Sequence, residues 1–298
     1  MEIHFEIENR CLLECRHCSS FAQATGNNQE YSVQDMIRFL NLFGSVDKQV
    51  FLTGGEPLLH PDIRDMIETL KENTCNTKIG LFTSGIVDDG VKLTSVSDEL
   101  AYDLSTRGVN CCYLSVYCSD AQGHDWMTGV SGSFGLTQQS IRILKKNDID
   151  VRFNTVVTAV NADRIIDIIK LAEDWEVSEV RLLKLIRHGR AIGSWNEIEM
   201  NELQYRDLVN RVRRIKTNVN ITVSGMEDVI PCRKFCKVGE CPAGKKLWYV
   251  TYKGEIFPCA SVKNNPSFCV GTVSDDMLKN KIMKNTSILS GGMLCRSL

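Results

Sequence analysis

The segment Cys11-Leu12-Leu13-Glu14-Cys15-Arg16-His17-Cys18 places three cysteines on one short stretch of chain. It follows directly on residues 3–7, whose alternating apolar and polar side chains predict a β-strand. Three thiolates on one loop can ligate three irons of a cubane iron–sulfur cluster, whereas complete ligation by protein takes four cysteines. One iron would then be open to a small molecule. The alternatives are a zinc site and chance spacing of the cysteines, although zinc sites usually show paired C-x₂-C units or histidines at finger spacing.

Strand-like and helix-like runs alternate over the first two thirds of the chain. The expected strands are residues 3–7, 50–53, 78–83, 111–117, 151–157 and 180–185, and the expected helices are residues 33–43, 63–70, 97–106, 135–146, 165–175 and 203–215. Such alternation predicts a parallel sheet covered by helices. We therefore expect an α/β fold, a partial (β/α)₆ TIM-like barrel over residues 1–216, with its chemistry at the C-terminal ends of the strands.

After residue 216 the helical rhythm stops and the density of cysteines rises. The cysteines of this stretch include Cys232, Cys236, Cys241, Cys259 and Cys269. Residues 248–251 and 255–257 predict a β-hairpin around Lys253-Gly254, which would bring Cys241 and Cys259 together. The pattern predicts a small second domain, residues 217–298, organised around metal.

Composition and charge narrow the class of protein. The chain has 298 residues, 13 cysteines and a formal net charge of −2, which gives no support to a nucleic-acid binder. No apolar run reaches the ~18 residues of a membrane span, and the N-terminus lacks the features of a signal peptide. We expect a cytoplasmic protein with no membrane partner. Disulfides are rare there, so the cysteines indicate metal or redox chemistry.

A glycine-rich turn follows the second expected strand and reads Gly54-Gly55-Glu56-Pro57. Together with the C-x₃-C-x₂-C segment it resembles the radical S-adenosylmethionine (SAM) superfamily. The resemblance implies that Cys11, Cys15 and Cys18 hold a [4Fe–4S] cluster, while the backbone of the turn and Glu56 hold the amino group of SAM. Glycines permit close backbone approach, and a carboxylate suits an ammonium group. Reductive cleavage of SAM would yield a 5′-deoxyadenosyl radical that abstracts hydrogen from substrate.

The same resemblance implies further SAM contacts at strand ends. The candidates are Ser84, Ser115, Asn154 and Arg190. Each of the first three has an alternative role as a strand-end residue bonded to nearby backbone. For Arg190, contact with a carboxylate of SAM or substrate competes with an ordinary surface position.

The C-terminal cysteines resemble the opening of a SPASM domain or its shorter relative, the twitch domain. This resemblance implies one auxiliary [4Fe–4S] cluster. Its expected ligands are Cys241 and Cys259, then Cys232 and Cys236, with Cys269 competing for a place. A surplus cysteine, Cys118 or Cys269, would be a hydrogen-atom donor to a substrate radical. The alternative for Cys118 is a small buried apolar residue.

Residues 115–134, with His124-Asp125, resemble the corresponding segment of radical SAM enzymes that mature ribosomal peptides. That implies epimerisation, crosslinking or thioether formation on a peptide. The alternatives are a radical SAM epimerase or dehydrogenase for a small molecule such as an amino sugar, and a metal-bearing binding module without SAM chemistry. One expected partner is an electron donor such as flavodoxin or ferredoxin. Because the chain starts directly on its first strand, a short precursor peptide would be bound either by the barrel itself or by a separate leader-binding protein.

Overall fold

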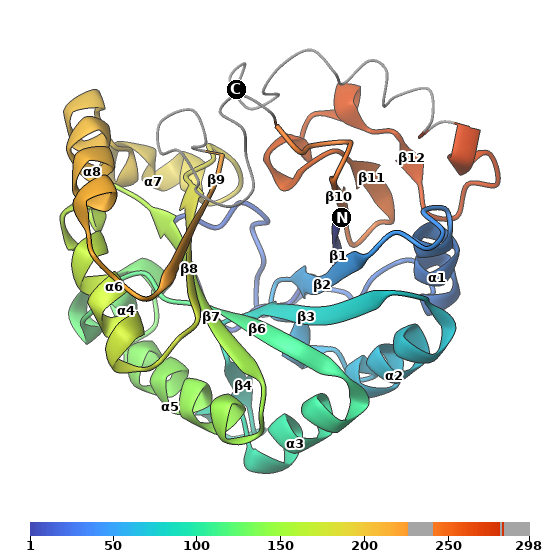
Figure 1. Cartoon of the computed structure of the whole chain (residues 1–298), viewed down its shortest axis with the longest axis horizontal. Coiled ribbons are helices and arrows are strands. Elements are labelled where there is room, and N and C mark those ends of the chain that lie inside the picture. Colours follow the sequence, from blue (N-terminus) through green and yellow to red (C-terminus); the bar gives the residue numbers. More distant parts are fainter. Residues whose placement is uncertain (226–240, 281, 283–298) are drawn as a thin grey trace.

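A single curved sheet organises the molecule (Figure 1). The computed structural model describes residues 1–225, 241–280 and 282. The ten strands lie in the order β12-β11-β10-β1-β2-β3-β6-β7-β8-β9. Their bounds are β1 (Glu2–Glu8), β2 (Lys48–Gly54), β3 (Thr77–Thr83), β6 (Val109–Ser115), β7 (Asp150–Val157), β8 (Glu179–Lys184), β9 (Asn220–Ser224), β10 (Leu247–Val250), β11 (Glu255–Phe257) and β12 (Gly271–Thr272). Neighbours from β10 to β9 are parallel, and β9 and β12 end the order, so the described strands form no closed barrel.

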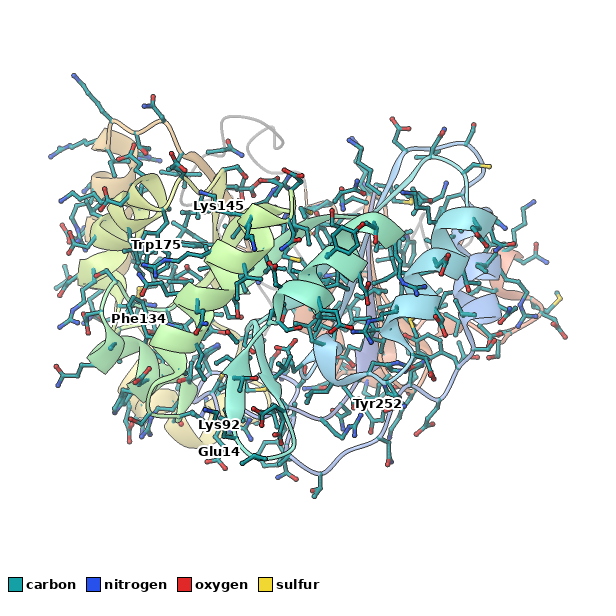
Figure 2. The ribbon with its side chains drawn as sticks, turned by 90° about the horizontal axis from the view of Figure 1, so that it is seen from below. Glu14, Lys92, Phe134, Lys145, Trp175 and Tyr252 are labelled. Carbon is teal, nitrogen blue, oxygen red and sulfur yellow. The ribbon has the colours of Figure 1, made fainter. Side chains whose placement is uncertain are left out.

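Helices cover the convex side of the sheet (Figure 1). They are α1 (Val33–Asn41), α2 (Ile63–Asn73), α3 (Asp98–Arg107), α4 (Ala121–Thr128), α5 (Ser133–Lys146), α6 (Ile165–Asp174), α7 (Ala191–Ile198) and α8 (Glu202–Arg214). Figure 2 shows this outer layer from below. There Lys145 of α5 donates a 2.6 Å hydrogen bond to the carbonyl of Trp175, and the Phe134 and Trp175 rings lie 5.8 Å apart.

The expected α/β architecture is confirmed. All six expected strands and all six expected helices are present, within a few residues of their expected bounds, and so is the C-terminal hairpin β10–β11. Among the described α-helices and strands, six were not expected: the hairpin of β4 (Ile86–Asp88) with β5 (Leu93–Ser95), the short helices α4 and α7, and the strands β9 and β12.

The sheet runs across the expected domain boundary at residue 216. Strand β9 extends the parallel sheet beside β8, and β10 pairs in parallel with β1, with Leu247 opposite Glu2 and Val250 opposite Phe5. The C-terminal hairpin is therefore continuous with the main sheet. The division into two domains stays a prediction.

The side chains of strand β1 alternate between the convex and the concave side of the sheet. Ile3, Phe5 and Ile7 are fully buried in the apolar core beneath the helices. Because side chains alternate along a strand, the polar residues between them belong to the concave side. No helix in the part of the chain that the structure describes has the length and apolar character needed to cross a membrane.

Candidate active site

A cavity of about 290 Å³ lies on the concave side, where several strands end. It is close to the lower end of the roughly 300–1,000 Å³ typical of ligand pockets. Residues from both halves of the chain line it. Those predicted from the sequence are Cys11, Cys15, Cys18, Gly54, Gly55, Glu56, Ser84, Ser115, Asn154 and Cys259.

The remaining candidates lie elsewhere. Pro57 begins the short helical turn Pro57–Leu59 just outside the cavity lining. Cys118 is buried against Gly123, and Cys269 packs beside Phe257 and Val262, so their placement gives the hydrogen-donor prediction no support. The lining also leaves out Arg190 and Cys241. Cys232 and Cys236 lie outside the described residues.

Residues 9–23, here called the cysteine loop, rest first on the glycine turn. The amide of Gly55 donates to the Glu8 carbonyl at 2.7 Å, and the amide of Glu56 donates to the Arg10 carbonyl at 2.8 Å. A Cβ at Gly54 would lie 2.0 Å from the Glu8 oxygen, and one at Gly55 would lie 2.0 Å from the Arg10 oxygen. Both glycines are therefore required by close packing of the chain on itself, in addition to any ligand.

The cysteine loop rests secondly on the end of α4. The amides of Glu14 and Arg16 donate to the carbonyls of Thr128 and Met127 at 2.9 and 3.0 Å. Asp125 stabilises the turn that follows.

Three groups at the start of α5 donate to that Asp125 carboxylate: the amides of Gly132 and Phe134 at 2.6 and 2.9 Å, and the Ser133 hydroxyl at 2.9 Å. Burial opposes the charge on Asp125, but these hydrogen bonds outweigh it and lower its pKa. Residues 115–134, which resemble a segment of peptide-maturing enzymes, thus have a structural role. The carbonyls of Met127 and Thr128 bind the cysteine loop, and Asp125 stabilises the turn beside them.

A third support comes from the segment between β8 and α7. Arg190 donates from Nε to the Cys15 carbonyl at 3.0 Å and from Nη2 to the Ala22 carbonyl at 2.8 Å. Its amide donates to the Cys18 carbonyl at 2.8 Å. Arg190 was predicted to meet a carboxylate of SAM or substrate. In the structure its guanidinium instead bonds to the backbone of the cysteine loop.

The carboxylate of Glu56 accepts hydrogen bonds from groups of the protein itself. It accepts from the Thr83 hydroxyl at 2.5 Å, from the Ser84 amide and hydroxyl at 2.8 and 2.6 Å, and from the Leu58 amide at 3.2 Å. Burial raises its pKa despite these four donors. Glu56 therefore ties the end of β2 to the end of β3, which orients the glycine turn.

Two polar atoms in the lining are buried without a partner among the described residues. They are Oδ1 of Asn154 and Nδ1 of His17. Burial lowers the pKa of His17 to about 3, with the charges of His124 and Arg190 adding to the effect, so its ring is neutral at pH 7. An unpaired buried acceptor costs free energy, which a ligand donor would offset. A nucleoside with hydroxyl and amino groups fits this requirement.

The thiols also fit a metal cluster. Burial, reinforced by the Glu56 charge, raises the pKa of Cys11 to about 12, and burial raises that of Cys15 well above its ordinary value. Thiolates in this position need a nearby cation, and metal ligation requires the deprotonated form. Within the described ranges no three His, Cys, Asp or Glu side chains converge as they would on a single metal ion. A cubane differs because each thiolate binds a separate iron.

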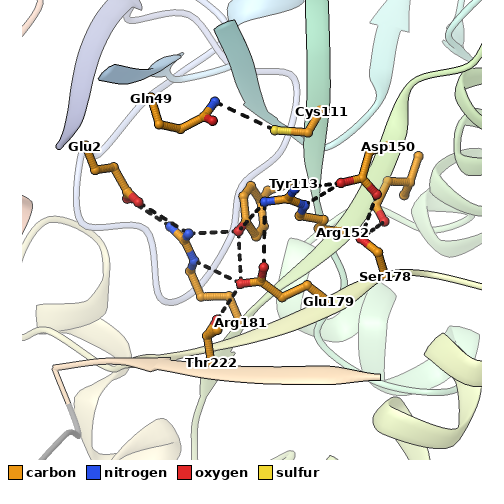
Figure 3. Close-up of polar contacts among 11 residues, drawn as sticks. Glu2, Gln49, Cys111, Tyr113, Asp150, Arg152, Ser178, Glu179, Arg181 and Thr222 are labelled. Carbon is orange, nitrogen blue, oxygen red and sulfur yellow. Dashed lines mark hydrogen bonds and ion pairs between the residues drawn. The ribbon is translucent and has the colours of Figure 1, made fainter. Parts of the chain in front are cut away.

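The floor of the cavity is a polar network that the sequence analysis missed (Figure 3). Arg181 of β8 donates to Glu2 of β1 at 2.9 Å and to the Tyr113 hydroxyl at 2.8 Å, and its guanidinium lies 4.2 Å from the Tyr113 ring centroid. Nε2 of His4 lies 2.6 Å from Oε1 of Glu2. Glu2, His4 and Arg181 all line the cavity. Part of this network could have been predicted from the sequence, because side chains alternate along the strand at residues 3–7 and Glu2 and His4 therefore lie on the same face.

A second buried network joins the cysteine loop to the C-terminal hairpin. Nζ of Lys263 donates to Glu6 and to the Ser20 hydroxyl, both at 2.6 Å, and the Tyr249 hydroxyl donates to Glu6 at 2.6 Å. Burial disfavours the charge on Glu6, but Lys263 and the hydrogen bonds outweigh it and lower its pKa. Ser20 and Tyr249 line the cavity. The floor and this wall of the cavity thus consist of polar groups that are paired with one another.

Comparison with known proteins places this site in context. A family model described as the radical SAM superfamily matches residues 5–172. An AdoMet-dependent heme synthase from Nitratidesulfovibrio vulgaris is 26% identical over 209 residues, which cover 70% of this chain and 54% of that protein. A PqqA peptide cyclase from Methylocella silvestris is 23% identical over 278 residues, which cover 92% of this chain and 72% of that protein. The chain thus spans about half the length of the heme synthase.

Solved structures share the fold. Streptococcus suis SuiB bound to S-adenosylmethionine superposes with a TM-score of 0.71 at 17% identity, covering 93% of this chain and 64% of that chain. Native anSMEcpe with bound AdoMet gives a TM-score of 0.72 at 14% identity, covering 98% of this chain and 84% of that chain. At such low identity these likenesses establish the architecture of the sheet and helices.

Proposed function

Since this chain belongs to the radical SAM superfamily, we propose that Cys11, Cys15 and Cys18 hold a [4Fe–4S] cluster whose open iron binds SAM. Membership itself implies an enzyme that uses SAM and such a cluster. Together these cofactors supply a 5′-deoxyadenosyl radical for hydrogen abstraction, while the protein orients them and excludes side reactions. The observation that carries the proposal is the single cavity shared by the three thiols and the Gly54-Gly55 turn.

The chain's own residues would orient SAM and exclude water. The glycine turn and Ser115 line the cavity together with the three cysteines. The unpaired Oδ1 of Asn154 would accept a hydrogen bond from a ribose hydroxyl. Glu56 would act on SAM through the turn that it fixes rather than through a free carboxylate.

The proposed substrate is a ribosomally made peptide. The match to a PqqA peptide cyclase extends over 92% of this chain, and the fold is shared with SuiB in its complex with the precursor peptide SuiA. Epimerisation, crosslinking and thioether formation are the reaction classes in question. A one-electron donor such as a flavodoxin or ferredoxin, a cytoplasmic location and a separate leader-binding partner belong to the same proposal.

An auxiliary [4Fe–4S] cluster forms part of this proposal. Cys259 is its best-supported ligand, because it lines the same cavity as the first three cysteines and its Sγ accepts from the Ser261 amide at 3.3 Å. Cys241 begins the same hairpin segment, and Cys232 and Cys236 would complete the set. A small molecule is the second candidate substrate, and the compact cavity of about 290 Å³ favours it.

Anaerobic reconstitution followed by iron analysis and a 5′-deoxyadenosine assay tests the proposal. We expect about eight irons per chain if two cubanes form. Cys15→Ala should abolish SAM cleavage, whereas Cys75→Ala, which removes an exposed thiol, should leave it unchanged. Zinc without SAM cleavage would overturn the radical assignment.

A second experiment separates the substrates and the role of the C-terminal cysteines. The enzyme is incubated with SAM, reductant and a precursor peptide encoded beside its gene, and the peptide is analysed by mass spectrometry and chiral amino-acid analysis. We expect Cys259→Ala to cleave some SAM in an uncoupled manner but to form little product. Full product from that variant would show that the auxiliary cluster is dispensable. Turnover of small molecules alone would favour the second candidate.

A further inference from the structure

The segment Gly189-Arg190 contacts the cysteine loop at three backbone carbonyls. The side chain of Arg190 reaches two of them, on Cys15 and Ala22, and its amide reaches that of Cys18. These carbonyls belong to two of the three cysteines and to the end of the same loop. One residue from the segment that follows β8 therefore joins three points of the loop, between Cys15 and Ala22.

The backbone geometry shows that the contact is close. Gly189 has a φ of 57°, and a Cβ there would lie 2.4 Å from the Cys18 oxygen. Only glycine allows this approach without displacing the loop. Phe21, which belongs to the loop, also contacts this guanidinium, whose carbon lies 5.3 Å from the centre of the ring. Phe21 also adopts a φ of 53°, uncommon for an aromatic residue.

The guanidinium also brings a fixed positive charge to the loop. Its Nε lies 3.0 Å from the carbonyl oxygen of Cys15, so the charge lies directly against the backbone of a proposed cluster ligand. Arginine keeps this charge at every physiological pH. A cation beside an iron–sulfur cluster stabilises the more negative, reduced form, because net charge and hydrogen bonding set the reduction potential.

We propose that Arg190 is a positioning residue that holds the cysteine loop in its cluster-binding shape and raises the reduction potential of the bound cluster. The inference rests on the proposed function, because it takes Cys11, Cys15 and Cys18 as the ligands. The two roles are separable. Holding the loop needs the planar, forked donor of arginine, whereas raising the potential needs only a positive charge.

The test uses the full-length reconstituted protein and two measurements. The first is the midpoint potential of the EPR signal that changes on addition of SAM, which selects the cluster with the open iron. The second is the rate at which a chelator removes iron. Arg187→Met is the matched control, because Arg187 is exposed on the same segment and its guanidinium lies over the Trp195 ring.

Arg190→Met should shift the midpoint potential to more negative values and speed iron release roughly tenfold, the usual scale for loss of a group that supports metal ligands. Arg190→Lys should keep the potential near that of the wild type but release iron faster. The Arg187→Met control should match the wild type in both measurements.

Three results would overturn the inference: wild-type values in Arg190→Met, equal potential shifts in the Lys and Met variants, or an equal effect in the control. If Arg190→Met does not fold, the release rate of Arg190→Lys decides the loop-holding role and its potential decides the charge role. A wild-type protein with no SAM-responsive signal would instead refute the proposed function.

Discussion

At the scale of single residues, the glycine turn shows how one motif serves packing as well as binding. Gly54 and Gly55 resemble a SAM-binding signature, yet the atoms nearest their missing side chains are the backbone oxygens of Glu8, which ends β1, and of Arg10, which begins the cysteine loop. The motif and the cysteines are therefore mechanically linked. A substitution in the Gly54-Gly55 turn should therefore first displace the cysteine loop.

Gly55→Ala should destabilise the protein by about 1–3 kcal/mol, because the new Cβ would overlap the Arg10 carbonyl. It should also reduce the iron retained after reconstitution. Urea unfolding of the apo protein and iron analysis measure the two effects. Gly135→Ala, in an open position of α5, is the control and should be neutral or slightly stabilising. Wild-type stability and iron content in Gly55→Ala would contradict the packing argument.

Asn154→Leu should separate ligand binding from stability. The unpaired Oδ1 has no partner to lose within the described structure, so the apo protein should be as stable as the wild type or more so. Binding of SAM should weaken by about 1–3 kcal/mol, because the acceptor is removed. Calorimetric titration and thermal unfolding provide the measurements. Unchanged affinity for SAM would remove Asn154 from the proposed site.

At the scale of elements, the alternation of strand-like and helix-like runs along the chain predicted the parallel strands. A parallel sheet needs a helix between consecutive strands, and that helix buries one face of the sheet. The short hairpin β4–β5 was missed although Asp89-Gly90, a typical hairpin dipeptide, marks its turn. Helix α4 was missed because only eight residues carry it and Gly123 lies inside. The three thiols and the turn were foreseen from local motifs. The contacts of Arg190 and Arg181 were not, because they depend on pairings between distant strands.

The contact between β1 and β8 should give the protein a measurable pH dependence. Burial opposes the charge on Glu2, but Arg181 and His4 outweigh it and lower its pKa to about 2, from an ordinary value of 4.5. A lowered carboxyl pKa stabilises the folded state above the ordinary value, and this stabilisation is lost as the pH falls from 4.5 towards 2.

Glu2→Gln should therefore cost about 1–3 kcal/mol at pH 7, and the difference from the wild type should shrink through that acidic window. Urea unfolding of the apo proteins at a series of pH values measures the effect. A difference that stays constant down to pH 3 would show that Glu2 acts through packing rather than charge.

At the scale of the whole molecule, the buried pair of Lys263 and Glu6 joins the segment that follows the C-terminal hairpin to the first strand. Lys263→Met should destabilise the protein by roughly 3–5 kcal/mol, because it leaves the Glu6 charge buried without its cation. Adding Glu6→Gln to that variant should recover part of the loss, since the unpaired charge is then gone.

A double-mutant cycle of urea unfolding, with hydrogen exchange over residues 247–273, measures this coupling. We expect faster exchange in the hairpin of Lys263→Met. Strict additivity of the two changes would mean that the pair does not couple the hairpin to the sheet.

The pairing of β10 with β1 also determines the order in which a growing chain can mature. Strand β1 is translated well before β10, so the edge that β10 covers stays open until residues 247–250 have been translated. Until Lys263 has followed, Glu6 has no cation beside it. The cysteine loop extends directly from this unfinished strand. Insertion of a metal cluster is therefore expected only after residues 247–263 have been translated, long after its proposed ligands Cys11, Cys15 and Cys18 have been made.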